Sequence, residues 1–167
     1  MVFIRLDSPE GQAILALAKS KATEIANRIA NVKGLAMEIH EITPAYLNTP
    51  VGAATPAPTM DSSRQITIAQ SCGIVFCGFA NFLTSGGTVG TRLRIQKGRE
   101  YITDLFVNAI SGFSEDKRGV DSGFLSWGVW QEGEDLSWGF LDTVPTSAPN
   151  VWFIGYLTVP EGKNQIY

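Results

Sequence analysis

Histidine and cysteine are scarce in this chain of 167 residues, which contains only His40, Cys72 and Cys77. A Ser-His-Asp or Cys-His catalytic arrangement would have to use His40, and a typical zinc site needs more ligands of these types. The two cysteines lie in an apolar stretch that we expect to be a strand, which would hold them roughly 16 Å apart and beyond disulfide reach. We therefore expect two buried free thiols, no cofactor and no enzymatic activity.

Charge is also scarce, because Asp, Glu, Lys and Arg make up 17% of the residues and the formal net charge is −3. A net negative chain gives no general electrostatic reason to bind nucleic acid. No apolar run approaches the roughly 18 residues of a membrane span, and residues 1–6 lack the basic region and long apolar core of a signal peptide. We expect neither a nucleic acid nor a membrane as partner.

Residues 8–33 have the pattern of one helix. Ser8 is a favourable N-cap, Pro9 suits the first helical position, and Gly34 accepts the left-handed conformation that ends many helices. Apolar side chains recur within this span at alternating spacings of three and four, and they form a seam of Leu15, Ala18, Ala22, Ile25, Ile29 and Val32. The seam has two interpretations, which the pattern leaves open: it packs on the protein's own domain, or it contacts other helices or another protein as an anchor.

Residues 43–60 contain half of the eight prolines and no charged residue. Such a segment is expected to run extended as a semi-stiff spacer. Because an uncharged linker gains little from floating free in water, we expect it to lie on a neighbouring surface. The predicted organisation is a helical anchor over residues 1–42, a Pro/Ala/Thr-rich spacer over 43–63 and a β-sandwich over 64–167.

The body of the chain has the pattern of successive strands separated by turns, with no long helical period between them. This spacing predicts a mainly β protein, an antiparallel jelly-roll-like sandwich, preceded by the helix and the spacer. The expected strands cover residues 65–70, 73–83, 89–96, 101–110, 124–130, 136–141 and 151–159.

Carboxylates cluster in residues 131–135, where Glu132, Glu134 and Asp135 lie close together, with Asp142 nearby. We interpret residues 131–135 as a hairpin turn between two strands rather than as a catalytic carboxylate pair. The loop over residues 114–121 has oxygen ligands without the spacing of an EF-hand, and the sequence leaves open whether it binds calcium.

Four side chains are candidates for an interface or a glycan contact. Trp127 and Trp130 are three residues apart on an expected strand, so they should face opposite sides, and one of them should leave the core. Arg92 and Arg94 share one face of another expected strand. Exposed tryptophan and arginine are typical of oligomer interfaces and also of sugar-binding clefts.

Residues 136–145, Leu-Ser-Trp-Gly-Phe-Leu-Asp-Thr-Val-Pro, and residues 151–156, Val-Trp-Phe-Ile-Gly-Tyr, resemble the end of small virion proteins of tailed phages. Those proteins share a jelly roll like that of tumour necrosis factor or C1q. Residues 87–95 are similar to their Arg-bearing strand, and the likeness covers roughly residues 64–160. The chain departs from the pattern at residues 148–150, where such proteins often carry a glycine. The resemblance implies a homotrimer that stands out from a capsid or tail and is held by its N-terminal part.

From these features we expect a non-enzymatic structural protein of a tailed-phage particle, a homotrimeric capsid decoration (cement) protein anchored by its N-terminal arm. Its partners would be copies of itself and the major capsid protein or another virion protein. It would be assembled in the host cytoplasm and located in the virion. The alternative is a tail-fibre or receptor-binding tip protein that recognises a host surface glycan.

Overall fold

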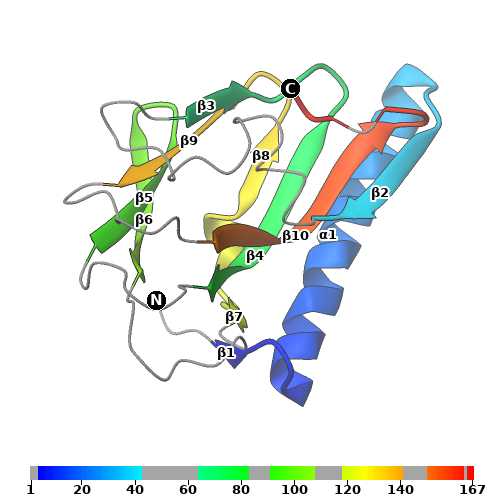
Figure 1. Ribbon diagram of the computed structural model, residues 1–167. Helices are drawn as coiled ribbons and strands as arrows, with labels where there is room; N and C mark the ends of the chain where they lie inside the picture. The colour runs from blue at the N-terminus through cyan, green and yellow to red at the C-terminus, as the bar shows by residue number, and fades with distance from the viewer. Residues whose placement is uncertain (1–3, 43–63, 83–90, 108–117, 141–149, 164) are drawn as a thin grey trace.

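The computed structural model describes residues 4–42, 64–82, 91–107, 118–140, 150–163 and 165–167 (Figure 1). The predicted spacer over residues 43–63 lies outside these ranges. The described residues form one α-helix, one 3₁₀ helix and ten strands, in the order β1 (Ile4–Arg5), α1 (Pro9–Lys33), β2 (Met37–Glu41), β3 (Arg64–Thr67), β4 (Gly73–Phe82), β5 (Thr91–Lys97), β6 (Glu100–Val107), β7 (Arg118–Val120), η1 (Phe124–Ser126), β8 (Val129–Gln131), β9 (Asp135–Phe140) and β10 (Asn150–Pro160).

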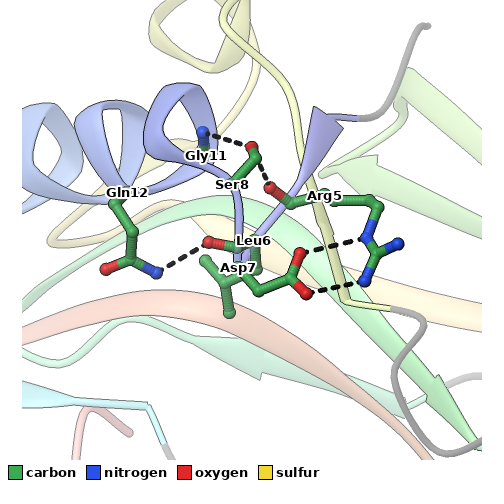
Figure 2. A network of polar contacts seen from close by, with 6 residues as sticks. All are labelled: Arg5, Leu6, Asp7, Ser8, Gly11 and Gln12. Carbon is green, nitrogen blue, oxygen red and sulfur yellow. Dashed lines mark hydrogen bonds and ion pairs between the residues drawn. The ribbon is translucent and has the colours of Figure 1, made fainter.

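The helix begins and ends where its capping residues predict. Ser8 Oγ accepts a hydrogen bond from the backbone N–H of Gly11 (3.0 Å) and donates one to the carbonyl of Arg5 (2.6 Å), as Figure 2 shows. The side chain of Gln12 donates to the carbonyl of Leu6 at 2.7 Å in the same network. At the other end Gly34 has a φ of 67° and donates its N–H to Ala30. These bonds satisfy backbone groups that a helix end leaves without partners.

The strands form two antiparallel sheets. The first has the order β1-β7-β4-β10-β2, with β8 also paired to β4, and the second has the order β3-β9-β5-β6. The predicted fold class, a mainly β antiparallel sandwich preceded by a helix, is confirmed. Three strands were not expected from the sequence, namely β1, β2 and β7, and the expected strand over residues 124–130 is wrong. That span contains η1 and only the first part of β8, because the chain turns at Phe124–Trp127 before it pairs with β4.

Two apolar clusters hold three layers together. One lies between the two sheets, with Ile74 and Phe76 of β4 on one side and Ile95 of β5 and Leu136 of β9 on the other. The second lies between α1 and the first sheet and contains Ile14, Ala18, Ala22, Ile25, Val75, Cys77, Val120, Phe124 and Ile154. Figure 1 shows the same arrangement, with α1 (blue) beside β10 and β4 and the second sheet on the far side. Burying a side chain such as Ile25 stabilises the fold by about 1.5–3 kcal/mol.

The described part of residues 1–42 is not a separate unit, contrary to the predicted organisation. β2 pairs with β10 along its whole length, and β1 pairs with β7. Ile42 is buried in the cluster between the two sheets. The uncharged composition of residues 43–60 suggested a domain boundary, but the strands on either side of that segment belong to the same sandwich.

Residues 131–135 form a turn, but not the predicted hairpin. The turn closes with a hydrogen bond from Glu134 N–H to the Gln131 carbonyl (3.1 Å), and Gly133 has a φ of 81°. The strand before it, β8, pairs with β4 in the first sheet, whereas the strand after it, β9, pairs with β3 and β5 in the second. The turn therefore carries the chain from one sheet to the other.

Candidate functional site

A groove of about 190 Å³ lies at the C-terminal half of α1. Its apolar wall comes from three side chains of the helix seam, Ile25, Ile29 and Val32. Its other lining residues are Arg28 and Lys33 of the helix, Cys72 before β4, and Gln131 and Glu132 of the turn between the sheets. The groove therefore combines apolar and charged surface contributed by three separate parts of the chain.

The charged end of the groove is a closed network around the Glu132 carboxylate. Lys33 Nζ donates to Glu132 Oε2 at 2.8 Å and to Ser71 Oγ at 3.1 Å. The backbone N–H of Ser71 donates to the same carboxylate oxygen at 2.6 Å. Ser71 has a φ of 64°, a left-handed conformation that a residue with a side chain adopts at a cost. The two bonds to Glu132 and Lys33 hold it there.

The pKa values of two lining residues are shifted from their ordinary values. The hydrogen bond from Lys33, and next the one from the Ser71 backbone, lower the pKa of the Glu132 carboxyl. Burial raises the pKa of the Cys72 thiol. Glu132 is therefore a carboxylate paired with a cation, and Cys72 is a protonated thiol with little nucleophilic character.

Beside this network the guanidinium of Arg28 donates a hydrogen bond to an uncharged acceptor, Gln131 Oε1, at 2.8 Å. Among the residues that the structure describes, no carboxylate pairs with Arg28. This wall of the groove therefore offers a cation next to apolar side chains.

The predicted seam lies mostly against the protein's own sheet. Ala18, Ala22 and Ile25 are buried in the cluster between α1 and the first sheet, and Leu15 and Ile29 pack partly against it. Val32 is different, because it is 78% exposed at the edge of the groove. Of the two interpretations of the seam, packing on its own domain is the one observed, and Val32 at its C-terminal end is the seam residue that is mostly exposed.

Trp127 and Trp130 do not face opposite sides of one strand. Trp130 is fully buried, stacks on Phe76 with ring centroids 4.8 Å apart, and donates its Nε1–H to the Asp135 carbonyl. Trp127 lies just after η1 and before β8, is partly buried, and contacts the same Phe76 ring at 5.4 Å. The prediction is wrong because β8 begins only at Val129, so Trp127 is not part of a strand.

The two predicted arginines lie on β5. The guanidinium of Arg94 lies over the ring of Tyr101 at 4.9 Å, and Tyr101 is 53% exposed. Arg94 is next to Ile95, which faces the core, so Arg94 projects from the outer face of the second sheet. Arg92 is opposite Phe106 of β6 in the strand register, and the position of its side chain is outside the described structure.

The acidic residues of the turn each have a structural partner. Glu134 accepts from the Gln131 N–H at 2.8 Å and pairs with Lys97 at 3.3 Å, and Asp135 accepts from Thr67 Oγ1 at 2.6 Å. Asp142 lies outside the described residues, as do residues 114–117 of the loop for which the sequence left calcium binding open. Asp121 of that loop accepts from the Gly123 N–H at 2.8 Å. Within the described ranges no group of three His, Cys, Asp or Glu side chains is placed to hold a metal ion.

Sequence reasoning missed the polar half of the groove. Lys33 and Glu132 are 99 residues apart, and Arg28 and Gln131 are 103 apart, so no local pattern connects them. The end of α1 at Gly34 was the one usable signal, because a basic residue is favoured in the last turn of a helix.

Comparisons with family models, curated proteins and solved structures found no match to this chain. Among the described helices, none is long and apolar enough to cross a membrane.

Proposed function

We propose that this chain is a non-enzymatic structural protein of a tailed-phage particle, a homotrimeric capsid decoration protein. The proposal starts from the resemblance of residues 64–160 to small phage virion proteins. The antiparallel two-sheet sandwich is the architecture that this resemblance implies. The carboxylates Glu132, Glu134 and Asp135, each bound by a donor within the fold, serve structure rather than catalysis.

The observation that carries the proposal is the exposed end of the helix seam at the groove. A partner cannot contact Ala18 or Ala22 without separating α1 from its sheet. Val32 is instead exposed beside the groove, with Ile29 next to it and Arg28 on the same wall. We assign the contact with the major capsid protein, or another virion protein, to this surface. An apolar side chain of the partner would bury Val32, and a carboxylate would pair with Arg28.

We assign the trimer contact to the outer face of the second sheet. Arg94 and Tyr101 lie there in contact with each other, on the opposite face from the core. Tyrosine and arginine are enriched at the centres of protein interfaces. The contact with the particle and the contact between copies are thus on opposite sides of the sandwich.

In the tail-fibre alternative, Trp127 and Trp130 are the candidate side chains for contact with a host glycan, and one of them is not accessible. Trp130 is fully buried, so it offers no surface on which a sugar ring could stack.

Two measurements test the proposal. Light scattering on the purified protein should give three times the chain mass, and a monomer at micromolar concentration would overturn the trimer. The Val32→Asp variant should keep this mass but fail to occupy particles that lack the protein. Leu17→Asp is the matched control, because Leu17 is a partly exposed apolar residue of the same helix outside the groove. Normal occupancy by Val32→Asp would overturn the anchor site.

A further inference from the structure

β2 is the outermost strand of the first sheet. It pairs with β10 on one side, and no strand in the described part of the chain lies on its other side (Figure 1). An edge strand presents backbone N–H and C=O groups that can pair with another chain.

Two hydrogen bonds identify which backbone groups face the free edge. The N–H of Ile42 donates to the Gly155 carbonyl (2.9 Å), and the carbonyl of Ala36 accepts from the Glu161 N–H (2.8 Å). In an antiparallel ladder the N–H and C=O of one residue point to the same side, and the side alternates along the strand. The even-numbered residues of β2 therefore bond to β10, and the backbone groups of Met37, Ile39 and Glu41 point to the free edge.

The side chains of this strand are complementary to themselves. In an antiparallel pair of two β2 strands centred on Ile39, Met37 lies opposite Glu41 of the other copy, Ile39 opposite Ile39, and Glu38 opposite His40. The residues with free backbone groups then form the hydrogen-bonded pairs. Glu38 and His40 form the non-hydrogen-bonded pairs, whose side chains are closest.

The two neighbouring two-fold registers lose this match. A register centred on Glu38 would place two carboxylates directly opposite each other, and one centred on His40 would place Glu38 opposite the buried Ile42. Within one copy, Glu38 Oε2 and His40 Nε2 already lie 3.0 Å apart on a partly exposed face. A second copy paired about Ile39 would bring two such pairs together, with each Glu38 opposite the His40 of the other copy.

We propose that β2 is a two-fold contact between copies of this chain, paired antiparallel about Ile39 with Glu38 of each copy against His40 of the other. The contact does not depend on the proposed function, and it uses a different surface from the groove and from the outer face of the second sheet. This contact doubles the mass of a monomer, and of a trimer when its three β2 edges pair with those of one other trimer, whereas the trimer contact triples the mass of a monomer.

Sedimentation equilibrium across a concentration series tests the contact. The native protein should double its mass, His40→Glu should weaken this step by about tenfold because it places two carboxylates opposite each other, and Glu38→Lys/His40→Glu should restore it. Asn27→Glu adds the same charge on the exposed face of α1 and should leave the step unchanged. In the associated state, hydrogen exchange should slow at the amides of Met37, Ile39 and Glu41.

Three results would overturn the proposal: no doubling of mass at about 1 mM, a His40→Glu variant that associates as the native protein does, or a double variant as weak as the single one. Failure of the trimer alone would leave the doubling step in place, so the two proposals fail separately.

Discussion

Lys33 and Glu132 join the last turn of the helix to the turn that links the two sheets, with Nζ and Oε2 2.8 Å apart across 99 residues of sequence. The same carboxylate oxygen also accepts the Ser71 N–H just before β4. One partly exposed carboxylate therefore connects all three layers of the protein.

Glu132→Gln should reduce stability most at neutral pH and least in acid. The pKa of the Glu132 carboxyl is lowered in the folded protein from its ordinary value of 4.5, chiefly by the hydrogen bond from Lys33. A lowered pKa contributes stability that is fully present above the unfolded value and is lost as the pH falls through the folded value. The difference in Tm between native protein and variant should therefore shrink as the pH falls below 4.5.

Thermal unfolding from pH 7 to pH 3 measures this difference. Glu161→Gln is the control, because Glu161 is exposed and outside the network, and its effect on Tm should be small at every pH. A Glu132→Gln difference that stays constant down to pH 3 would contradict the assigned ion pair.

Ser71→Gly and Ser71→Val should change the free energy of unfolding by clearly different amounts. The φ of 64° at Ser71 is accessible to glycine without cost, whereas a β-branched residue pays about 1–3 kcal/mol there. Glycine also loses the hydroxyl that accepts from Lys33, so Ser71→Gly should be close to neutral and Ser71→Val strongly destabilising. Urea unfolding of both variants checks this, and equal destabilisation would place the cost in the lost hydroxyl instead of the backbone.

The parts of the fold that the sequence predicted are those with local signals. Ser8, Pro9 and Gly34 sit next to the helix ends that they define, and the apolar run of β4 is continuous in sequence. β2 was missed because Ile39 is flanked by polar and charged residues, and its stability comes from pairing with a strand more than a hundred residues later. Pairing at such a distance leaves no trace in a single sequence.

At the candidate site, the path of the chain through the turn at residues 131–135 was likewise not predictable from local sequence. The residues of the turn at 131–135, with a glycine at Gly133, are suitable both for a hairpin and for a crossing between sheets, since the local geometry is the same in either case. Which strand each arm pairs with depends on β4 and β5. The helix seam is similar. Its apolar spacing correctly predicted a buried helix face, but it did not indicate which surface buries that face.

Cys72 and Cys77 should react with an alkylating reagent only after unfolding. Both are free and buried, and burial raises the pKa of the Cys77 thiol to about 12. The reactive species is the thiolate, which is scarce at pH 8 for such a group. Mass spectrometry after native and denatured alkylation should show no label and two labels, respectively. Rapid native labelling of Cys77 would mean that α1 separates readily from the sheet.

The fragment of residues 64–167 should not unfold cooperatively on its own. Removing residues 1–63 uncovers Val75, Cys77 and Ile154 on the helix side of the first sheet and leaves β10 without β2. Each large apolar side chain returned to water costs about 1.5–3 kcal/mol, and a domain's whole stability is about 5–15 kcal/mol. The loss of several such contacts together with one strand pairing is comparable with the whole free energy of unfolding of the domain. Calorimetry and near-ultraviolet circular dichroism should show a broad transition and weak aromatic signals for the fragment. Adding a peptide of residues 1–42 should restore both signals, because it supplies α1 and β2. A fragment that unfolds sharply near the Tm of the full chain would show that the helix is dispensable to the sandwich, and that its seam is available to a partner after all.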